Sequence, residues 1–225
     1  MMQPRLILCL LLSLVASSFS FGQNEPEKID SVAPVKKPNN LYVGLDIATP
    51  AMALFSDKQG AQGFISYQFR PKLAAIAELG YEKNNFSENH WNIDVDGLYG
   101  KIGANYFFTQ DKENPANGFY FGGRLAFASF NQNIKQYPIR DIYSNQVVGT
   151  GSLDKESVNA FWLEIVIGGR IELHKKLYAD FSLHPAVFIG GKKQQDIDAI
   201  VVPGYGRNNG PFNLPIFWGL SYQLF

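Results

Sequence analysis

The chain has 225 residues, of which 46% are hydrophobic and 14% aromatic, and its 20 Lys and Arg residues balance its 20 Asp and Glu residues. This length fits one domain with a short appendage, and the balanced charge favours neither a nucleic acid nor another strongly anionic partner. Beyond the N-terminus no apolar run reaches the roughly 18 residues that a spanning helix needs, so membrane crossing would require a closed β-barrel.

The first 22 residues have the layout of a secretory signal peptide. Arg5 provides the positive charge, Leu6 to Val15 form the apolar segment, and small residues precede a cleavage site after Gly22. A membrane anchor is the less favoured interpretation, because the apolar segment is short. Residues 23–40 are rich in proline and charge, which predicts a flexible periplasmic tether.

From Leu41 onward apolar residues recur at every second position, which is the period of a β-strand with one apolar face. No helical period of useful length interrupts this pattern. The last strand ends on an aromatic residue, Phe225, which is out of step with the apolar face that Tyr222 and Leu224 share. We predict eight strands, near residues 41–48, 63–70, 73–81, 98–108, 119–127, 161–173, 177–184 and 211–225.

The predicted connections alternate in length along the chain. Short links follow residues 70, 108 and 174, whereas longer ones cover residues 50–62, 83–97, 131–159 and 191–210. This alternation is typical of outer-membrane barrels, with short turns in the periplasm and long loops outside. The sequence therefore predicts an all-β, eight-stranded, antiparallel up-and-down barrel over residues 41–225, with both termini periplasmic. The alternative is an exported lipocalin-like ligand binder, whose apolar face would line a cavity.

Aromatic residues gather on the apolar face near the predicted periplasmic end of the strands. Such clustering is typical of the interfacial girdle of a membrane barrel. The predicted girdle consists of Tyr67, Phe69, Tyr106, Phe108, Phe119, Phe121 and Tyr222.

The opposite face of the strands carries charges of both signs, which would project into the barrel lumen. An eight-stranded barrel is only just wide enough to be filled by side chains, so we expect these charges to pair with one another. A narrow polar pore is the alternative interpretation. The predicted network consists of Asp46, Arg70, Glu78, Lys101, Arg124, Glu164, Arg170, Glu172, Asp180 and His184.

A catalytic interpretation concerns Ser182 and His184, which share one strand face at a spacing of two and could be oriented by Glu164 or Asp180. Such a pair could serve a lipid A-modifying enzyme, but these side chains face the lumen, away from lipid. The sole cysteine, Cys9, lies in the predicted signal peptide, and the histidines are too scattered for a metal cluster. We therefore predict no enzyme activity, no cofactor and no metal.

Apolar and aromatic residues also occur in the two longest predicted loops, 131–159 and 191–210. They favour either a compact folded cap or a surface that docks a protein partner, and the sequence does not separate the two. The residues singled out for docking are Tyr137, Tyr143, Tyr205 and Arg207.

Several spaced segments resemble a family of small outer-membrane barrels of Bacteroidota, known as a domain of unknown function. They are AELGYEK (77–83), KIGANYFF (101–108), GFYFGGRLAFASFNQ (118–132), FWLEIVIGGRIELHKKLYADFSL (161–183) and VVPGYGRNNGPFNLPIFWGLSYQLF (201–225). The resemblance implies an outer-membrane location and a porin-like or OmpA-like barrel, but no site residues.

Together, the residues and the resemblance predict a structural or interaction protein of the outer membrane. We expect it to contact outer-membrane lipid, to need the barrel-assembly machinery for insertion, and to dock a surface lipoprotein or a membrane complex through its long loops.

Overall fold

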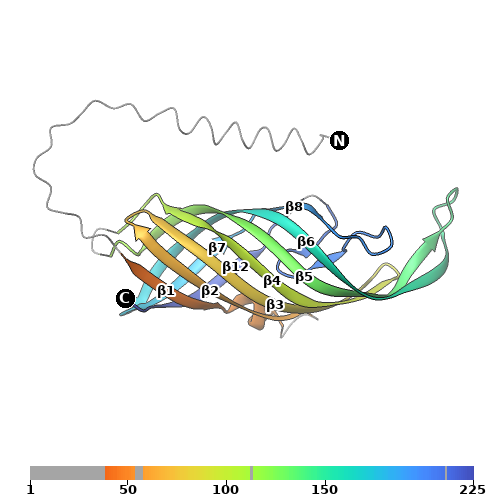
Figure 1. Ribbon diagram of the computed structural model, residues 1–225, viewed down its shortest axis with the longest axis horizontal. Coiled ribbons are helices and arrows are strands. Elements are labelled where there is room, and N and C mark those ends of the chain that lie inside the picture. Colours follow the sequence, from red (N-terminus) through yellow and green to blue (C-terminus); the bar gives the residue numbers. More distant parts are fainter. Residues whose placement is uncertain (1–38, 54–57, 112–113, 211) are drawn as a thin grey trace, which may run out of the picture. The chain divides into compact units, whose positions relative to one another are not determined.

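The computed structural model describes residues 39–53, 58–111, 114–210 and 212–225 (Figure 1). The predicted signal peptide and nearly all of the predicted tether lie outside these residues. The elements are β1 (Asn40–Asp46), α2 (Ala48–Met52), β2 (Lys58–Arg70), β3 (Leu73–Glu88), β4 (Trp91–Phe107), β5 (Gly118–Arg140), β6 (Val147–His174), β7 (Leu177–Leu183), β8 (Ala186–Gly191), β9 (Val201–Val202), β10 (Gly206–Arg207), β11 (Phe212–Asn213) and β12 (Ile216–Gln223).

The long strands pair with their chain neighbours in antiparallel fashion, and the sheet closes on itself. Strand β12 pairs with β7 on one side and with β1 on the other, where Val43 lies opposite Tyr222. Within the described residues the ring therefore contains eight strands in the order β1, β2, β3, β4, β5, β6, β7, β12. The predicted eight-stranded antiparallel barrel is confirmed.

The seventh and eighth strands of the ring are each interrupted by a proline. Pro185 separates β7 from β8, and Pro215 separates β11 from β12, but the register on either side of each proline is the same. The carbonyl of Pro185 accepts a hydrogen bond from the N–H of Ile165, and that of Pro215 accepts one from His184, both at 2.9 Å. Because proline has no N–H, one bond is missing from the ladder on each side of the seventh strand.

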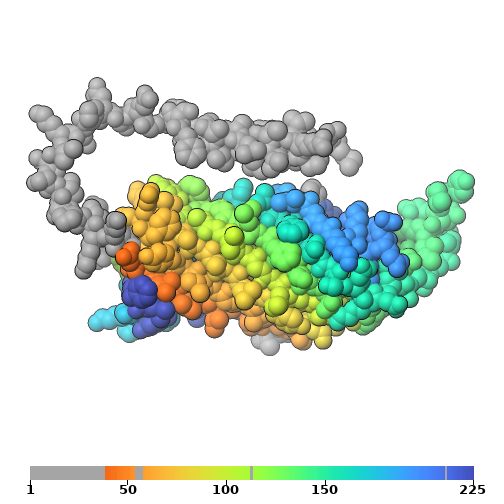
Figure 2. Space-filling view, in the orientation of Figure 1, coloured from red at the N-terminus to blue at the C-terminus, as the bar shows by residue number. Residues whose placement is uncertain are grey.

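Most strands run further than the sequence predicted: β2 already begins at Lys58, within the predicted loop 50–62, and β8 continues the seventh strand past residue 184. The segments 83–97 and 131–159, expected to be loops, continue the β3–β4 and β5–β6 ladders, so this part of the prediction was wrong. The β3–β4 hairpin closes through Asn89 and His90, whose positive φ angles of 51° and 69° suit a tight two-residue turn. The β5–β6 hairpin forms the long projection in green in Figures 1 and 2.

Along these extended strands the apolar side chains change from the outer face of the barrel to the inner face. On the outer face of β5, Leu125 (59% exposed) and Phe127 are followed by the polar Ser129, whereas the inward side chains change from Arg124 to Phe130, which is 2% exposed. The same inversion occurs on β4, where the inward residues beyond the apolar outer face include Ile93 and Val95. The barrel is thus apolar outside along its main part and apolar inside at one end.

A folded segment from the last long connection fills this apolar end. Residues 199–208, called the plug, contain the β9–β10 hairpin and pack against the inner faces of β4, β5 and β6. Val202 and Tyr205 are at most 1% exposed, and the ring of Tyr205 lies 5.8 Å from that of Trp162. The plug is held from both sides, because Gly204 donates to Glu82 at 3.1 Å and Asn213 donates to the carbonyl of Tyr205 at 2.7 Å.

Candidate functional site

Charged side chains of opposite sign meet in the interior of the barrel. Strands β3 and β5 bring Glu78 and Arg124 to 2.9 Å, and β4 and β6 bring Lys101 and Glu164 to 2.8 Å. Arg170 and Asp180, which are partners in the β6–β7 register, form a third pair at 2.8 Å. No side chain of these pairs is more than 5% exposed. Burial this complete is tolerated because each charge is paired and hydrogen-bonded.

His184 lies between Ser182 and Glu164. Its Nε2 is 2.8 Å from Oγ of Ser182, and its Nδ1 is 2.8 Å from Oε2 of Glu164. This is the order of nucleophile, base and orienting carboxylate found in hydrolases. Here, however, Ser182 has no exposed surface, and Phe217 packs against the imidazole at 5.8 Å. Glu164 also accepts a hydrogen bond from Trp162 on the same strand, at 2.7 Å. Because Glu164 lies on β6 and Ser182 on β7, the contacts of His184 with both side chains link these two strands.

Three members of the predicted network do not join these pairs. Asp46 is buried, but its carboxylate accepts the backbone N–H groups of Ala48 and Thr49, at 3.0 and 3.1 Å, at the start of α2. Glu172 is half-buried near the short turns, where it accepts a hydrogen bond from the N–H of Lys176. Arg70 is exposed, contrary to the expectation that it faces the lumen, because it follows a register shift that ends the strand alternation.

The seven residues of the predicted girdle all lie on the outer face and are between 37% and 62% exposed. Several touch one another: Tyr106 and Phe121 have ring centroids 5.3 Å apart, and Phe108 stacks on Phe119 at 6.4 Å. They lie toward the end of the barrel where β2 turns into β3 and β6 turns into β7. The same end holds the hydrogen bond from Leu41 to the carbonyl of Phe225 at 3.0 Å.

The structure separates the four residues predicted to dock a partner. Tyr205 is 1% exposed in the plug, so it is unavailable for docking and its assignment was wrong. Tyr137 is half-buried, with its ring 6.2 Å from that of Trp91. Arg207 forms an exposed ion pair with Glu88 at 2.8 Å. Tyr143, at the tip of the β5–β6 hairpin, is 97% exposed. The last connection is therefore a folded cap, and the hairpin tip is a free surface.

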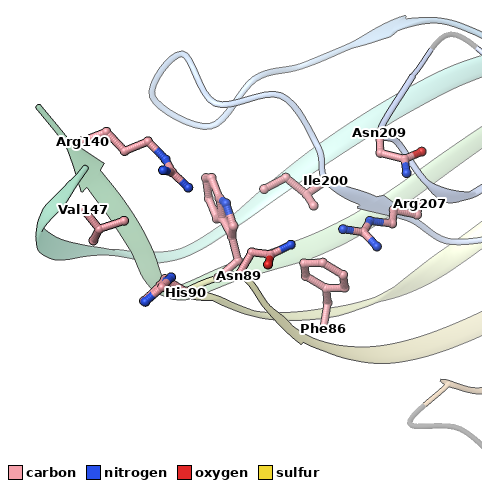
Figure 3. Close-up of a pocket in the computed structure, with 9 residues that line it drawn as sticks. Phe86, Asn89, His90, Arg140, Val147, Ile200, Arg207 and Asn209 are labelled. Carbon is pink, nitrogen blue, oxygen red and sulfur yellow. The ribbon is translucent and has the colours of Figure 1, made fainter. Parts of the chain in front are cut away.

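A pocket of about 540 Å³ at the end of the barrel opposite the short turns was not predicted (Figure 3). It lies where the β3–β4 turn, the β5–β6 hairpin and the plug approach one another. The sequence offers one sign of it: apolar and polar residues alternate in WNIDVD (91–96), directly after Asn89 and His90, which is typical of a strand that follows a turn. The lining residues are Phe86, Asn89, His90, Trp91, Arg140, Val147, Ile200, Arg207 and Asn209.

Metal-binding clusters and long apolar helices are both absent from the part of the chain that the structure describes. Across the described ranges, no group of three or more His, Cys, Asp or Glu side chains is placed to hold a metal ion. No helix among the same residues is long and apolar enough to cross a membrane.

Comparison with solved structures finds small barrels of the outer membrane. A major outer membrane protein from Thermus thermophilus is 9% identical, with a TM-score of 0.49, over 83% of this chain and 100% of that one. The N-terminal β-barrel domain of Pseudomonas aeruginosa OprF is 13% identical, with a TM-score of 0.38, over 84% and 100%. Ail, the attachment invasion locus protein of Yersinia pestis, is 12% identical, with a TM-score of 0.40, over 84% and 100%.

Curated proteins give no match to this sequence. The family model described as "Domain of unknown function (DUF6048)" matches residues 2–224, which is nearly the whole chain. The protein therefore belongs to the DUF6048 family.

Proposed function

We propose that this protein is an integral barrel of the bacterial outer membrane with a structural and interaction role, and that its outer end docks a partner. The observation that carries the membrane part is the inverted alternation of β4 and β5. A strand whose outer face is apolar over about nine residues and then becomes polar is suited to cross a hydrocarbon layer and emerge into water.

The same features support an orientation. The aromatic girdle and the short β2–β3 and β6–β7 turns lie at one end, which we assign to the periplasm, as in other membrane barrels. The extended β3–β4 and β5–β6 hairpins and the plug then face the outside of the cell. Insertion in this orientation would require the barrel-assembly machinery.

The closed interior supports a role other than transport or catalysis. The layer of ion pairs around Glu164 and the plug above it fill the lumen, so ions would have to displace both. The Ser182–His184 pair is enclosed in this layer, and an acyl chain from the membrane would have to pass between strands to reach it. These observations favour neither a pore nor a lipid A-modifying enzyme.

The tip of the β5–β6 hairpin supports the docking role. Ile142 and Tyr143 are 93% and 97% exposed, and Val148 is 68% exposed. Large apolar side chains grouped on a projecting hairpin are typical of a surface that another protein covers, and a tyrosine is a common anchor of such interfaces. The partner we favour is a surface lipoprotein or a larger outer-membrane complex.

The test removes the apolar groups and keeps the hairpin. A triple variant, Ile142→Ser with Tyr143→Ser and Val148→Thr, is compared with wild type and with Gln146→Ala, a change at an exposed polar position of the same tip. After extraction in mild detergent, the proteins that co-purify are identified by mass spectrometry. We expect a partner that is present with wild type and Gln146→Ala and lost with the triple variant. Identical sets from all three proteins would contradict the docking role.

A further inference from the structure

We infer that the outer pocket binds an acidic sugar, that is, a saccharide carrying a carboxylate or phosphate group. Three segments form its walls: the β3–β4 turn, the end of β5 with the start of β6, and the plug. Its volume of about 540 Å³ is within the range of small-molecule sites in proteins. This inference goes beyond the docking role, because it concerns a small ligand and not the hairpin tip.

Of the two arginines that line the pocket, Arg140 gives it a preference for an acidic ligand. In Figure 3 the guanidinium groups of Arg140 and Arg207 approach the pocket from opposite sides. Arg207 is neutralised by Glu88 at 2.8 Å. Arg140 donates to the backbone carbonyl of Asn145 at 3.0 Å, and among the described residues no carboxylate pairs with it. A guanidinium has five N–H donors and binds carboxylate or phosphate oxygens in pairs, so Arg140 fits one acidic group of a ligand.

The other lining residues fit the body of a sugar. Trp91 offers a flat apolar ring, whose orientation is fixed by packing against Tyr137 at 6.2 Å. The side-chain amides of Asn89 and Asn209 supply both donors and acceptors, which hydroxyl groups require. An apolar face next to several polar groups is the usual composition of a specific small-molecule site. A simple inorganic anion would leave the tryptophan ring unused.

The walls of the pocket are ordered before any ligand arrives. The two-residue turn at Asn89 and His90 fixes one wall. In the plug wall, Asn208 donates through its backbone N–H to Ile200 at 2.8 Å and through its side chain to Ala199 at 2.9 Å. Arg207 is held over the ring of Phe86, with 4.7 Å between its Cζ and the ring centroid. Preformed walls lower the ordering cost of binding, which a weakly binding sugar could not otherwise offset.

The test compares galacturonic acid with galactose, which differ by one carboxylate. Binding to the purified full-length barrel in detergent is measured by titration calorimetry. We expect galacturonic acid to bind at least 10-fold more tightly than galactose, and Arg140→Gln to lose at least 10-fold of that affinity. Lys83→Gln serves as the matched control, because it removes an exposed positive charge on β3 that does not line the pocket.

Further arms identify the source of the sugar and exclude misfolding. Lipopolysaccharide with its acidic outer sugars, and the same lipid after their removal, are added to barrels in lipid nanodiscs. Preference for the intact lipid identifies a membrane-linked sugar, and binding of free galacturonic acid alone identifies a soluble one. Circular dichroism checks that Arg140→Gln remains folded. Equal affinity for both monosaccharides, no binding of either, or an unchanged affinity in folded Arg140→Gln would overturn the inference. The triple tip variant should still bind the sugar, so failure of one proposal leaves the other standing.

Discussion

Lys101 and Glu164 form an ion pair of 2.8 Å between β4 and β6, and neither side chain is more than 5% exposed. The same carboxylate also meets Trp162 and His184, so it connects three neighbours in the barrel interior. Because so many groups depend on one charge, the pair offers a direct test of how the interior is stabilised.

Replacing Lys101 by Met should leave the carboxylate of Glu164 buried without its cation. Removal of one partner of a buried pair costs on the order of 3–5 kcal/mol, and we expect a loss of this size in the free energy of unfolding. Urea titration of the barrel in lipid vesicles, followed by tryptophan fluorescence, measures it. The double variant Lys101→Met with Glu164→Gln should recover part of the loss. A double variant that is no more stable than the single one would show that charge pairing is not the cause.

The prediction that the apolar outer face of the barrel contacts lipid can be tested on one strand. Leu125→Arg places a charge on the outer face of β5 where we expect lipid. Ser129→Arg places the same charge on the same face four residues later, where the outer face has become polar. A charge in the middle of a bilayer costs a membrane barrel about 2–4 kcal/mol, and near the interface about 0–1 kcal/mol. Unfolding in vesicles should therefore be much easier for Leu125→Arg. Equal effects of the two changes would contradict the predicted membrane boundary.

The plug depends on Gly204. This residue has a φ of 75°, and a Cβ built there would lie 2.4 Å from the ring of Tyr99. Gly204→Ala should therefore disfavour the docked plug by about 1 kcal/mol or more and leave the ring of strands intact. Gly210→Ala is the matched control, because its Cβ would meet nothing within 4 Å. Limited proteolysis should cut residues 192–210 faster in Gly204→Ala only, and equal rates in both would argue against this account.

The extended part of β4, β5 and β6 around Asp96 should loosen in acid. Although burial raises the pKa of this carboxyl, hydrogen bonds from Lys155 at 3.0 Å and Asn131 at 3.2 Å outweigh it, and the pKa is lowered below 3.8. A carboxyl with a lowered pKa stabilises the folded state above its unfolded pKa and loses this effect as the pH falls through the folded value. The protection factors for hydrogen exchange in β4 and β5, which correct for the intrinsic pH dependence of exchange, should thus fall below about pH 4. Asp96→Asn should show a smaller pH dependence, and an unchanged one would exclude this group.

Much of the barrel could be predicted because the period of two is unbroken where lipid is expected. From Phe161 to Leu173 every second position except Gly169 carries a large apolar side chain, and β6 includes the whole segment. The ends of the strands were not predicted, because the apolar residues there lie on the inner face of the barrel instead of the outer face. Ile93 and Val95 point inward, whereas Ile102 points outward. The apolar residues of β4 therefore do not keep to one face, and the segment resembles a loop in the sequence.

The site was harder to predict, because its parts come from distant segments. Arg207 meets Glu88 only after the plug has folded into the barrel mouth. The docking role expected of Tyr205 was wrong because an aromatic residue in a predicted loop gives no sign that the loop turns inward. In contrast, the parity of Arg124 and Glu78 is enough to place both on the inner face, where they meet at 2.9 Å.

The seam between β1 and β12 has a consequence for assembly. It joins the first and last strands of the ring, with Leu224 donating to the carbonyl of Leu41 at 2.8 Å. Every other seam links strands that are neighbours in the chain, so closure of this one demands the largest loss of chain entropy. We expect the barrel to reach the membrane as an open, curled sheet, whose two free edges find each other last.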